Sequence, residues 1–430
     1  MPSTSLAYRT VVRLGVALAP LIAKRGSKLH GGIAARIGAT QRLAGWAQRH
    51  RDTTRPLLWI HAPSVGEGLQ AEAVLLRLRR DHPGWQVAYT YFSPSAEGLA
   101  SRQPCDVAEA LPWDIPGDVD AALDALRPNA LVFSKLDLWP ELATRAAARG
   151  TRVGMIAATV SPNSGRLRWP ALPMSRPGYA VVSGAGAVSE EDAARLSRLG
   201  VPAHRIEVTG DPRFDSVHHK VRAVPKDHPL LRCTGGAETL VAGSTWPEDE
   251  LRLLTGWSLV RAEHPGARLI LVPHEPTPAH LARLDSDAQR LGLGAPVRVH
   301  ESAEPSGLMV VDRVGVLAAL YTGASIAYVG GGFGHAGLHS VLEPAACGIP
   351  VLFGPEWKES RDAGSLVSAN AAWEVNTDLD RRWCGLLADP AARRGAGKAA
   401  LDMVEAGLGA AARSAGLIER LVLQNPATSR

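Results

Sequence analysis

Short apolar runs alternate along the chain with longer stretches in which apolar residues recur at helical spacing. Apolar runs bounded by turn residues are typical of buried strands, and the Ala/Leu/Arg-rich stretches between them are typical of helices. Strands that alternate with helices predict parallel sheets covered by helices, the α/β class. In the first half we expect strands at 57–61, 86–91, 130–133, 152–157 and 179–182 and helices at 69–80, 140–148 and 184–199.

The pattern stops between residues 216 and 233, where polar residues and proline accumulate, and then restarts. Because 430 residues exceed what one core usually holds, we expect two α/β domains, 1–217 and 218–412. A C-terminal helix and tail, 413–430, would follow, with packing back on the first domain as one option. The expected strands of the second half are 239–242, 267–272, 308–311, 325–329 and 349–353, and a helix broken near 406–409 closes the chain from 391 to about 423.

Composition narrows the class of protein. With 46% hydrophobic and 21% charged residues the chain resembles an average globular protein, which excludes a disordered or polytopic membrane protein. The formal net charge of +5 favours anionic partners. No dense Lys/Arg tract is interleaved with aromatic residues, so we expect no nucleic-acid partner. The four cysteines lack C-x-x-C spacing, which argues against a disulfide framework or a zinc site and for a reducing compartment.

The N-terminus carries an apolar run at 14–23 that is interrupted by Pro20 and flanked by basic residues. The run is too short to cross a bilayer. Our preferred interpretation is an amphipathic segment that rests on anionic lipid. A plain packed helix and a signal peptide are the alternatives, and the basic residues after the run do not resemble a cleavage region.

Charged and small residues follow two expected strands of the first half. In HAPSVGE, Ser64 and Gly66 belong to a turn and Glu67 lies in the first turn of the next helix. The helix dipole favours a carboxylate there, so Glu67 is either an ordinary helix-start acid or a general base that faces a ligand. Lys135 and Asp137 also follow a strand, either as solvated loop charges or as binding groups.

Three more segments place polar residues after strands. Arg213 in VTGDPRFD is either a fixed cation or part of a surface turn. Ser244 and Thr245 end a strand before a helix, where hydroxyl and backbone N–H groups favour a phosphate or a sugar, although a helix cap would look the same. His274 and Glu275 at a further strand end are a weaker candidate, because a structural pair is common.

The stretch GGGFGHAGLHS contains a G-x-G-x-x-G at Gly332, Gly334 and Gly337. These glycines let the backbone approach a ligand, and we expect His339 and Ser340 to open a helix with Glu343 one turn further in. Glu356 lies where a dinucleotide site places its acidic residue. Three expected strands of this half precede the one that leads into the motif, whereas a dinucleotide fingerprint belongs to the first strand of its domain.

In their order, these segments resemble the 3-deoxy-D-manno-octulosonic acid (Kdo) transferases of lipopolysaccharide assembly. The resemblance covers about residues 8–413, and its most specific pieces are HAPSVGE, DLWPEL, VTGDPRFD and VGGGFGHAGLHSVLEPAACGIPVLFGP. It implies a GT-B fold, with two Rossmann-like domains that face a central cleft. It also implies inverting transfer of Kdo from CMP-Kdo to a lipid A precursor, lipid IVA. It suggests a peripheral or N-terminally anchored enzyme on the cytoplasmic face of the inner membrane, without cofactor or metal.

The resemblance also assigns roles to residues. Glu67 matches the family's general base. The expected donor site comprises Ser244, Thr245, His274, Glu275, Gly331, Gly332, Gly334, His339, Ser340 and Glu343. Residues expected to contact the acceptor or to support the base are Ser64, Gly66, Lys135, Asp137 and Arg213.

The chain departs from the family pattern at several of these positions. Many members have H-N-P-L-E-P where Ser340 stands at the second position, E-T-E where the sequence reads Lys135-Leu136-Asp137, and Asn where Glu359 stands. The departures indicate a divergent branch and leave open the acceptor contacts and the number of Kdo units. Three alternatives stay open: another GT-B transferase such as a UDP-GlcNAc-dependent lipid A disaccharide synthase, an NAD(P)-dependent oxidoreductase, and a non-enzymatic lipid-binding protein.

Overall fold

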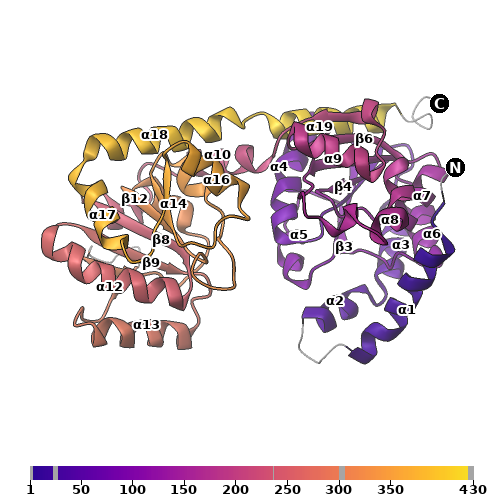
Figure 1. Ribbon diagram of the computed structural model, residues 1–430. Coiled ribbons are helices and arrows are strands. Elements are labelled where there is room, and N and C mark those ends of the chain that lie inside the picture. The colour runs from indigo at the N-terminus through magenta and orange to yellow at the C-terminus, as the bar shows by residue number, and fades with distance from the viewer. Residues whose placement is uncertain (1–2, 23–27, 236, 300–305, 425–430) are drawn as a thin grey trace. The chain divides into compact units, whose positions relative to one another are not determined.

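The structure is a computed structural model that describes residues 3–22, 28–235, 237–299 and 306–424. The chain divides into two compact units (Figure 1). Unit 1 consists of Met1–Ser216 together with Gly409–Arg430, and unit 2 consists of Val217–Leu408. Each unit is an α/β structure built on its own parallel sheet, as the hydrophobic pattern predicts.

Unit 1 contains a seven-stranded sheet in the order β3-β2-β1-β4-β5-β6-β7, with every neighbouring pair parallel. The order reverses direction between β1 and β4, the point at which open α/β sheets bind ligands. The strands are β1 Leu57–His61, β2 Gln86–Tyr91, β3 Val107–Ala110, β4 Ala130–Ser134, β5 Arg152–Ala158, β6 Val182–Ala187 and β7 Ile206–Val208.

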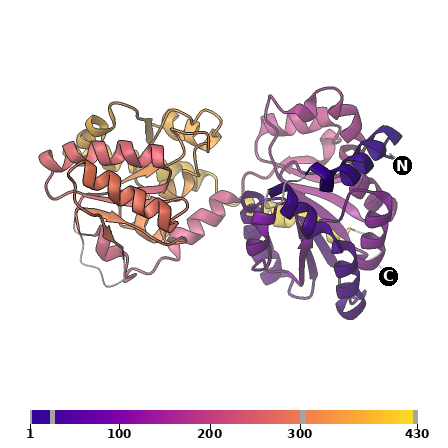
Figure 2. The ribbon, with the colours of Figure 1, turned by 90° about the horizontal axis from the view of Figure 1, so that it is seen from below.

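Helices cover both faces of this sheet (Figure 2), because its strands are apolar on both sides. Trp59 and Phe133 belong to one core layer, whereas Leu58 and Ile60 belong to the other. The helices assigned to unit 1 are α1 Leu6–Ile22, α2 Lys28–Arg36, α3 Ala39–His50, α4 Val65–Asp81, α5 Glu97–Ala100, α6 Pro116–Leu126, α7 Pro140–Ala148, α8 Ala171–Ala180, α9 Glu190–Leu199 and α19 Ala410–Leu423, with α10 Arg213–Arg222 crossing its boundary.

The last helix, α19, lies against β5 and β6 of unit 1. Two glycines make this close approach possible. A Cβ at Gly154 would lie 2.5 Å from Leu421 Cδ1, and a Cβ at Gly184 would lie 2.8 Å from Leu417 Cδ1. Asp215 accepts hydrogen bonds from the amides of Gly409 at 2.8 Å and Ala411 at 2.9 Å. The chain therefore returns to its first unit and completes that unit's core.

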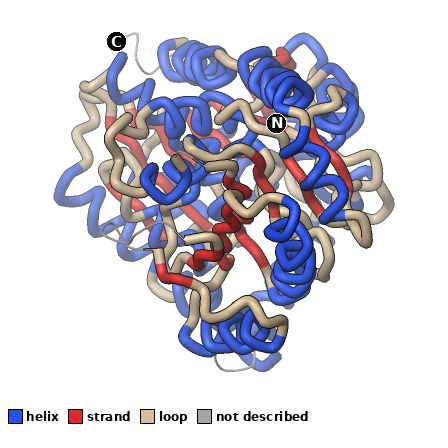
Figure 3. The backbone as a smooth tube through the Cα atoms, turned by 90° about the vertical axis from the view of Figure 1, so that its left-hand side faces the viewer, coloured by secondary structure: helices blue, strands red, loops and turns tan. Residues whose placement is uncertain are grey.

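Unit 2 repeats the architecture with the strand order β10-β11-β9-β8-β12-β13-β14, again parallel throughout. In Figure 3 the strands of both units lie between helices. The strands are β8 Thr239–Thr245, β9 Arg268–Pro273, β10 Val297–Arg298, β11 Leu308–Val310, β12 Ile326–Val329, β13 Val351–Phe353 and β14 Ala372–Glu374. The helices are α11 Leu231–Thr234, α12 Pro247–Glu263, α13 Pro278–Arg290, α14 Leu317–Thr322, α15 Leu342–Ala346, α16 Arg361–Ser368, α17 Leu379–Ala388 and α18 Pro390–Ala406.

Two predicted elements were wrong. The expected strand at 179–182 begins inside α8, and the expected helix at 184–199 is strand β6 followed by the shorter helix α9. The sequence of β6, VSGAGA, has the small residues that helices also use, and it lacks a run of branched side chains. Its small residues serve the packing of α19, a tertiary contact that local periodicity does not encode.

Helix α1 is 17 residues long, and no helix in the described parts of the chain is long and apolar enough to cross a membrane. Val11, Leu14 and Leu18 recur at helical spacing on α1 and are 50–57% exposed. Tyr8 and Arg9, by contrast, bind polar groups of unit 1. The helix thus has an anchored side and an exposed apolar stripe.

Candidate functional site

The two strand-order reversals each carry a cluster of the predicted residues. In unit 1, β1 leads into the turn before Glu67, and its neighbour β4 leads into Lys135 and Asp137. In unit 2, β8 ends with Ser244 and Thr245, and its neighbour β12 leads into the glycine-rich loop. Because parallel neighbours end at the same sheet edge, segments far apart in sequence meet there.

Glu67 lies in the first turn of α4. The hydroxyl of Ser64, the N-cap residue, donates to Glu67 Oε2, and Lys135 Nζ lies 2.9 Å from Glu67 Oε1. The Glu67 side chain is only 14% exposed, so its carboxylate lines a pocket of unit 1 rather than open solvent. The Lys135 side chain is 46% exposed. Gly66 is exposed in the same turn. The structure thus brings together Ser64, Glu67 and Lys135.

Lys135 adopts an unusual backbone conformation with φ +62°. Left-handed geometry is uncommon for residues other than glycine and costs on the order of 1 kcal/mol. The Lys135 amide donates to the carbonyl of Ile156 at 2.8 Å, which anchors the turn. The strained turn directs the Lys135 ammonium group towards Glu67, so this ion pair depends on an unfavourable backbone conformation.

Asp137, two residues after Lys135, is hydrogen-bonded to three other side chains. It accepts hydrogen bonds from His61 Nε2 at 3.3 Å, Trp139 Nε1 at 3.1 Å and Arg166 Nη2 at 3.2 Å. Burial by itself raises the pKa of Asp137, but the hydrogen bond and charge of His61 together with Arg166 outweigh it, so the pKa lies below its usual range. Asp137 is therefore an anion that positions its neighbours.

These residues surround a pocket of about 460 Å³ in unit 1. Phe92 and Trp139 form an aromatic wall, stacked with ring centroids 5.6 Å apart. The guanidinium of Arg36 lies 3.8 Å from the centre of the Phe92 ring, and burial lowers its pKa to about 10, so it is still a cation at neutral pH. The residues lining the pocket are Pro63, Glu67, Phe92, Lys135, Leu136, Asp137, Trp139 and Arg166.

The sequence did not single out His61, Phe92, Trp139, Arg166 or Arg36. They come from separate elements, and no spacing rule connects them. The excess of tryptophan, 11 of the aromatic residues, was the available signal, but it does not say which tryptophan lines a site.

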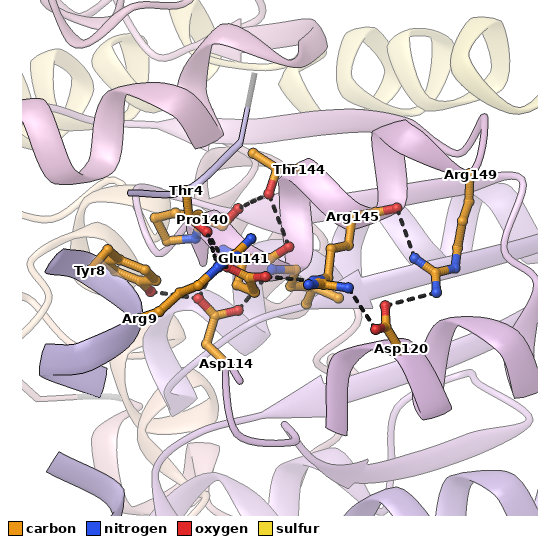
Figure 4. Close-up of polar contacts among 11 residues, drawn as sticks. Thr4, Tyr8, Arg9, Asp114, Asp120, Pro140, Glu141, Thr144, Arg145 and Arg149 are labelled. Carbon is orange, nitrogen blue, oxygen red and sulfur yellow. Dashed lines mark hydrogen bonds and ion pairs between the residues drawn. The ribbon is translucent and has the colours of Figure 1, made fainter. Parts of the chain in front are cut away.

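A polar network holds the helix that follows Trp139 (Figure 4). Asp114 accepts from the amides of Glu141 at 3.0 Å and Leu142 at 2.8 Å, both in the first turn of α7, and from the Tyr8 hydroxyl. Burial raises the pKa of Asp114 to about 6 despite these donors. Glu141, fully buried, pairs with Arg9 and Arg145. The network fixes α1 and α7, and with them the start of the aromatic wall.

Arg213 has a defined partner in unit 1. Its Nε and Nη2 bind Asp211 Oδ2 at 2.8 and 2.7 Å, and the other Asp211 oxygen accepts from Gln70 on α4 at 3.1 Å. The contact links Arg213 to the helix that carries Glu67. Arg213 therefore supports α4 through its contact with Asp211.

In unit 2 the glycine-rich loop packs tightly on the end of β8. Ser244 has a left-handed backbone with φ +54°. A Cβ at Gly330 would lie 2.3 Å from the Ser244 carbonyl oxygen, and one at Gly331 would lie 2.1 Å from the Gly337 carbonyl oxygen. Contacts that short leave no room for a side chain, so glycine is required at both positions.

Two imidazoles and an indole stack beside this loop. The His274 and His339 rings are 4.3 Å apart, and Trp246 Nε1 donates to His339 Nε2 at 2.9 Å. Burial, with a smaller effect of His274, lowers the pKa of His339 to about 4. His339 is therefore neutral at physiological pH, with Nε2 in the acceptor state. The predicted residues His274 and His339 do meet, whereas Glu275 is exposed at the adjoining turn.

Two buried carboxylates, Asp249 and Glu250, organise this region. The sequence pattern did not identify them as functional candidates. Asp249 Oδ2 accepts from the amides of Gly331 and Trp246, both at 2.9 Å, and Oδ1 accepts from the Tyr328 hydroxyl at 2.7 Å. Glu250 accepts from Thr245 Oγ1 at 2.8 Å. In PEDE they look like ordinary acids of a helix start. The Gly331 amide and the Thr245 hydroxyl are thus engaged within the protein.

The helix after the loop differs from the expectation. His339 and Ser340 lie outside it, because α15 begins at Leu342 and ends at Ala346. The Ser340 hydroxyl accepts from the Leu342 amide at 3.4 Å, and Glu343 in the first turn forms an ion pair with Lys220 of α10. The irregular segment before the helix is held by the His339 amide, which donates to the carbonyl of Gly330 at 3.1 Å.

Comparison with known proteins gives a family match within unit 1 and similarities to whole proteins over most of the chain. Residues 33–216 match the family model of 3-deoxy-D-manno-octulosonic-acid transferases (kdotransferases). Among curated proteins, the 3-deoxy-D-manno-octulosonic acid transferase of Bordetella pertussis is 28% identical over 380 residues, which are 84% of this chain and 86% of that protein. The transferase of the same name from Chlamydophila psittaci is 29% identical over 326 residues, 74% of each chain.

Solved structures resemble the chain in fold. A UDP-GlcNAc 2-epimerase from Neisseria meningitidis bound to UDP-GlcNAc aligns with a TM-score of 0.61 at 14% identity and covers 86% of this chain and all of that one. A glycosyltransferase from Rickettsia africae aligns with a TM-score of 0.56 at 11% identity, over 86% of this chain and 99% of its own. These likenesses, together with the two parallel seven-stranded sheets, confirm the predicted GT-B architecture.

Proposed function

The chain belongs to the 3-deoxy-D-manno-octulosonic acid transferase family and is a glycosyltransferase, and we propose that it transfers Kdo from CMP-Kdo to lipid IVA, a lipid A precursor, with inversion at the anomeric carbon. One observation carries the proposal. The carboxylate of Glu67 lies on the wall of a pocket at the strand-order reversal of unit 1, held by Ser64 and Lys135. By resemblance, Glu67 matches the glutamate of the family's S-[VI]-G-E sequence, which supports the proposal that it is the base.

The chemistry assigned to Glu67 is general-base catalysis. An acceptor hydroxyl has a pKa far above 7, so its proton must pass to a base as the oxygen attacks the anomeric carbon. In the proposed step the new C–O bond forms on the face opposite the departing phosphate, the bond from the anomeric carbon to the CMP phosphate oxygen breaks, and Glu67 takes the proton. The Lys135 ammonium forms an ion pair with Glu67 at the wall of the pocket and orients its carboxylate.

Unit 2 is proposed to hold CMP-Kdo. The loop between Gly330 and His339 supplies a backbone surface that approaches closely because side chains are excluded. The stack of the neutral His339 ring on His274 offers imidazole faces and edges to a nucleotide or a sugar acid. Because the Gly331 amide already donates to Asp249, we assign phosphate contacts to the segment from Gly332 to Gly337.

The acceptor is proposed to be reached from the cytoplasmic face of the inner membrane. Supporting this location is the apolar stripe of α1, where Val11, Leu14 and Leu18 are exposed while the opposite side of the helix is anchored to α7. An amphipathic helix with this arrangement lies in the membrane interface. The basic net charge adds attraction to anionic lipid.

The test is a product assay with the purified protein, a CMP-Kdo generating system and tetra-acylated lipid A precursor, read by mass spectrometry. Wild-type protein is expected to add the mass of Kdo to the acceptor. Glu67→Gln should slow transfer by roughly 10²–10⁴-fold, the usual contribution of a general base, and should leave CMP binding intact.

The matched control is Glu190→Gln, which removes an exposed acid from the first turn of α9 in the same unit. It should retain wild-type turnover. Wild-type protein that modifies no lipid A precursor would contradict the proposed function. Near-normal turnover of Glu67→Gln would instead remove this residue from the role of base while leaving the reaction in place.

A further inference from the structure

Helices α12 and α17 of unit 2 pack side by side (Figure 1). A Cβ at Gly256 would lie 2.6 Å from Leu379 Cδ2, so the two backbones approach closely. One residue later on α12, Trp257 stacks on Trp383 of α17 with ring centroids 5.6 Å apart. Both rings are buried, at 3% and 0% exposure. The relative position of the two helices is therefore fixed by the core.

Three different metal-ligating groups converge at one end of this helix pair. Glu263 is the last residue of α12, and His264 is its C-cap with an extended φ of −128°. Since the chain leaves the helix there, these two consecutive side chains can bind the same metal ion. Cys384 follows Trp383 on α17, and its thiol donates a hydrogen bond to Glu263. One ligand atom from each of the three residues lies within 4.8 Å of the others.

We propose that Glu263, His264 and Cys384 form a binding site for Zn²⁺ or a divalent cation of similar softness. Zinc binds carboxylate oxygen, imidazole nitrogen and thiolate sulfur at about 2.0–2.3 Å, which separates its tetrahedral ligands by roughly 3.3–3.8 Å. Ligand atoms that lie within 4.8 Å of one another need a contraction of at most about 1.5 Å. The exposed Glu263 side chain can supply it by rotation, while Cys384 and His264 are partly buried and fixed.

The charges of this group suit a divalent cation. On binding, the S–H bond of Cys384 breaks, its proton goes to solvent and an S–metal bond forms, so that the thiolate and the Glu263 carboxylate together neutralise the ion. Nearby Asp380 adds to the negative potential at the thiol. Three protein ligands leave a fourth position for water. The bound ion would join the end of α12 to the middle of α17 and stabilise that helix interface.

The lack of C-x-x-C spacing among the four cysteines argued against a zinc site. The proposed ligands instead come from a helix end and from a helix much later in the chain, each contributing a different chemical type. Only the packing of α12 on α17 brings them together, so no local motif announces the site.

The test is a titration of chelator-treated full-length protein with Co²⁺, in buffer with a non-thiol reductant, followed by absorption spectroscopy. A bound thiolate gives a near-ultraviolet charge-transfer band, which should saturate at one equivalent and disappear when Zn²⁺ displaces the cobalt. Cys384→Ser should lose the band. His264→Gln should weaken Co²⁺ binding by about tenfold or more, since even indirect supports of a metal are worth 10–100-fold.

Cys347→Ser is the matched control, because Cys347 is another partly buried cysteine of unit 2. It should keep both the band and the affinity. The metal-free Cys384→Ser protein should keep the circular dichroism of wild type, so that a lost band is not a lost fold. Absence of the band in wild type, an equal band in Cys384→Ser, or saturation only at millimolar cobalt would each overturn the proposal. None of these results depends on the glycosyltransferase reaction.

Discussion

The two strand-order reversals of this protein are topologically equivalent but use their charged residues in opposite ways. In unit 1 the carboxylates of Glu67 and Asp137 border the pocket and pair with cations there. In unit 2 the carboxylates of Asp249 and Glu250 are buried and bind groups of the protein itself. The first region presents reactive side chains, whereas the second presents a shaped backbone. A duplicated fold thus presents charged side chains at one sheet edge and a closely packed backbone at the other.

Removing Asp249 should produce the largest loss of stability. In Asp249→Ala, the amides of Gly331 and Trp246 and the Tyr328 hydroxyl lose their acceptor in a buried site. Unsatisfied buried donors cost about 1–3 kcal/mol each, so unit 2 should lose about 3 kcal/mol or more. Hydrogen exchange of peptides from β8 and β12, read by mass spectrometry, measures this separately from unit 1.

Glu248→Ala is the control, since Glu248 is the exposed neighbour of Asp249 and should change the opening free energy by no more than about 0.5 kcal/mol. Exchange in β4 and β5 of unit 1 should stay at the wild-type rate in both variants. Equal protection of β8 in Asp249→Ala and wild type would contradict the role given to this carboxylate.

Acidification should separate the two units, with opposite signs. Burial raises the pKa of Asp114 to about 6 in unit 1, so its proton favours the folded state, and this contribution grows as the pH falls from 6 towards 4. Burial lowers the pKa of His339 to about 4 in unit 2, so stability is lost as the pH falls from 6.5 to 4. The effect is about 3 kcal/mol for the fully buried Asp114 and smaller for His339, because solvent screens its partly exposed ring.

The measurement is the opening free energy of β4 and of β12 from hydrogen exchange at several pH values. Asp114→Asn should flatten the pH dependence of unit 1, and His339→Gln that of unit 2. The exposed residues Asp124 and His335 provide matched substitutions, Asp124→Asn and His335→Gln, that should leave both slopes unchanged. Parallel slopes in the two units of the wild type would refute the contrast.

Lys135 tests the smaller effect of an exposed ion pair. Lys135→Met removes the cation 2.9 Å from Glu67, and transfer should fall by about tenfold because the base is less well oriented. Stability should change by less than about 1 kcal/mol, since exposed ion pairs contribute little. Turnover and unfolding measured on the same preparation check both expectations, and a stability loss as large as that of Asp249→Ala would show that the pocket of unit 1 is also a structural device.

Sequence patterns located both clusters because strand ends are local signals. HAPSVGE, the KLDLWP segment and the glycine-rich loop each follow a run that is a strand in the structure. What the patterns did not contain were contacts between elements. Arg36 reaches the aromatic wall from α2, and Asp249 holds the amide of Gly331 from α12, so their roles depend on tertiary packing. The same cause explains β6, whose glycine fits a helix from the far end of the chain.

The hydrogen bond from the Gly409 amide to Asp215 has a topological consequence. The chain leaves unit 1 after Ser216 and re-enters it at Gly409, so the exit and the return are neighbours. In sequence, unit 2 is inserted between two segments of unit 1. A unit inserted in this way can be exchanged without cutting the core of unit 1, whereas a truncation before α19 would expose the apolar surface of β5 and β6. A frameshift late in the gene would therefore damage the half of the protein that is encoded first.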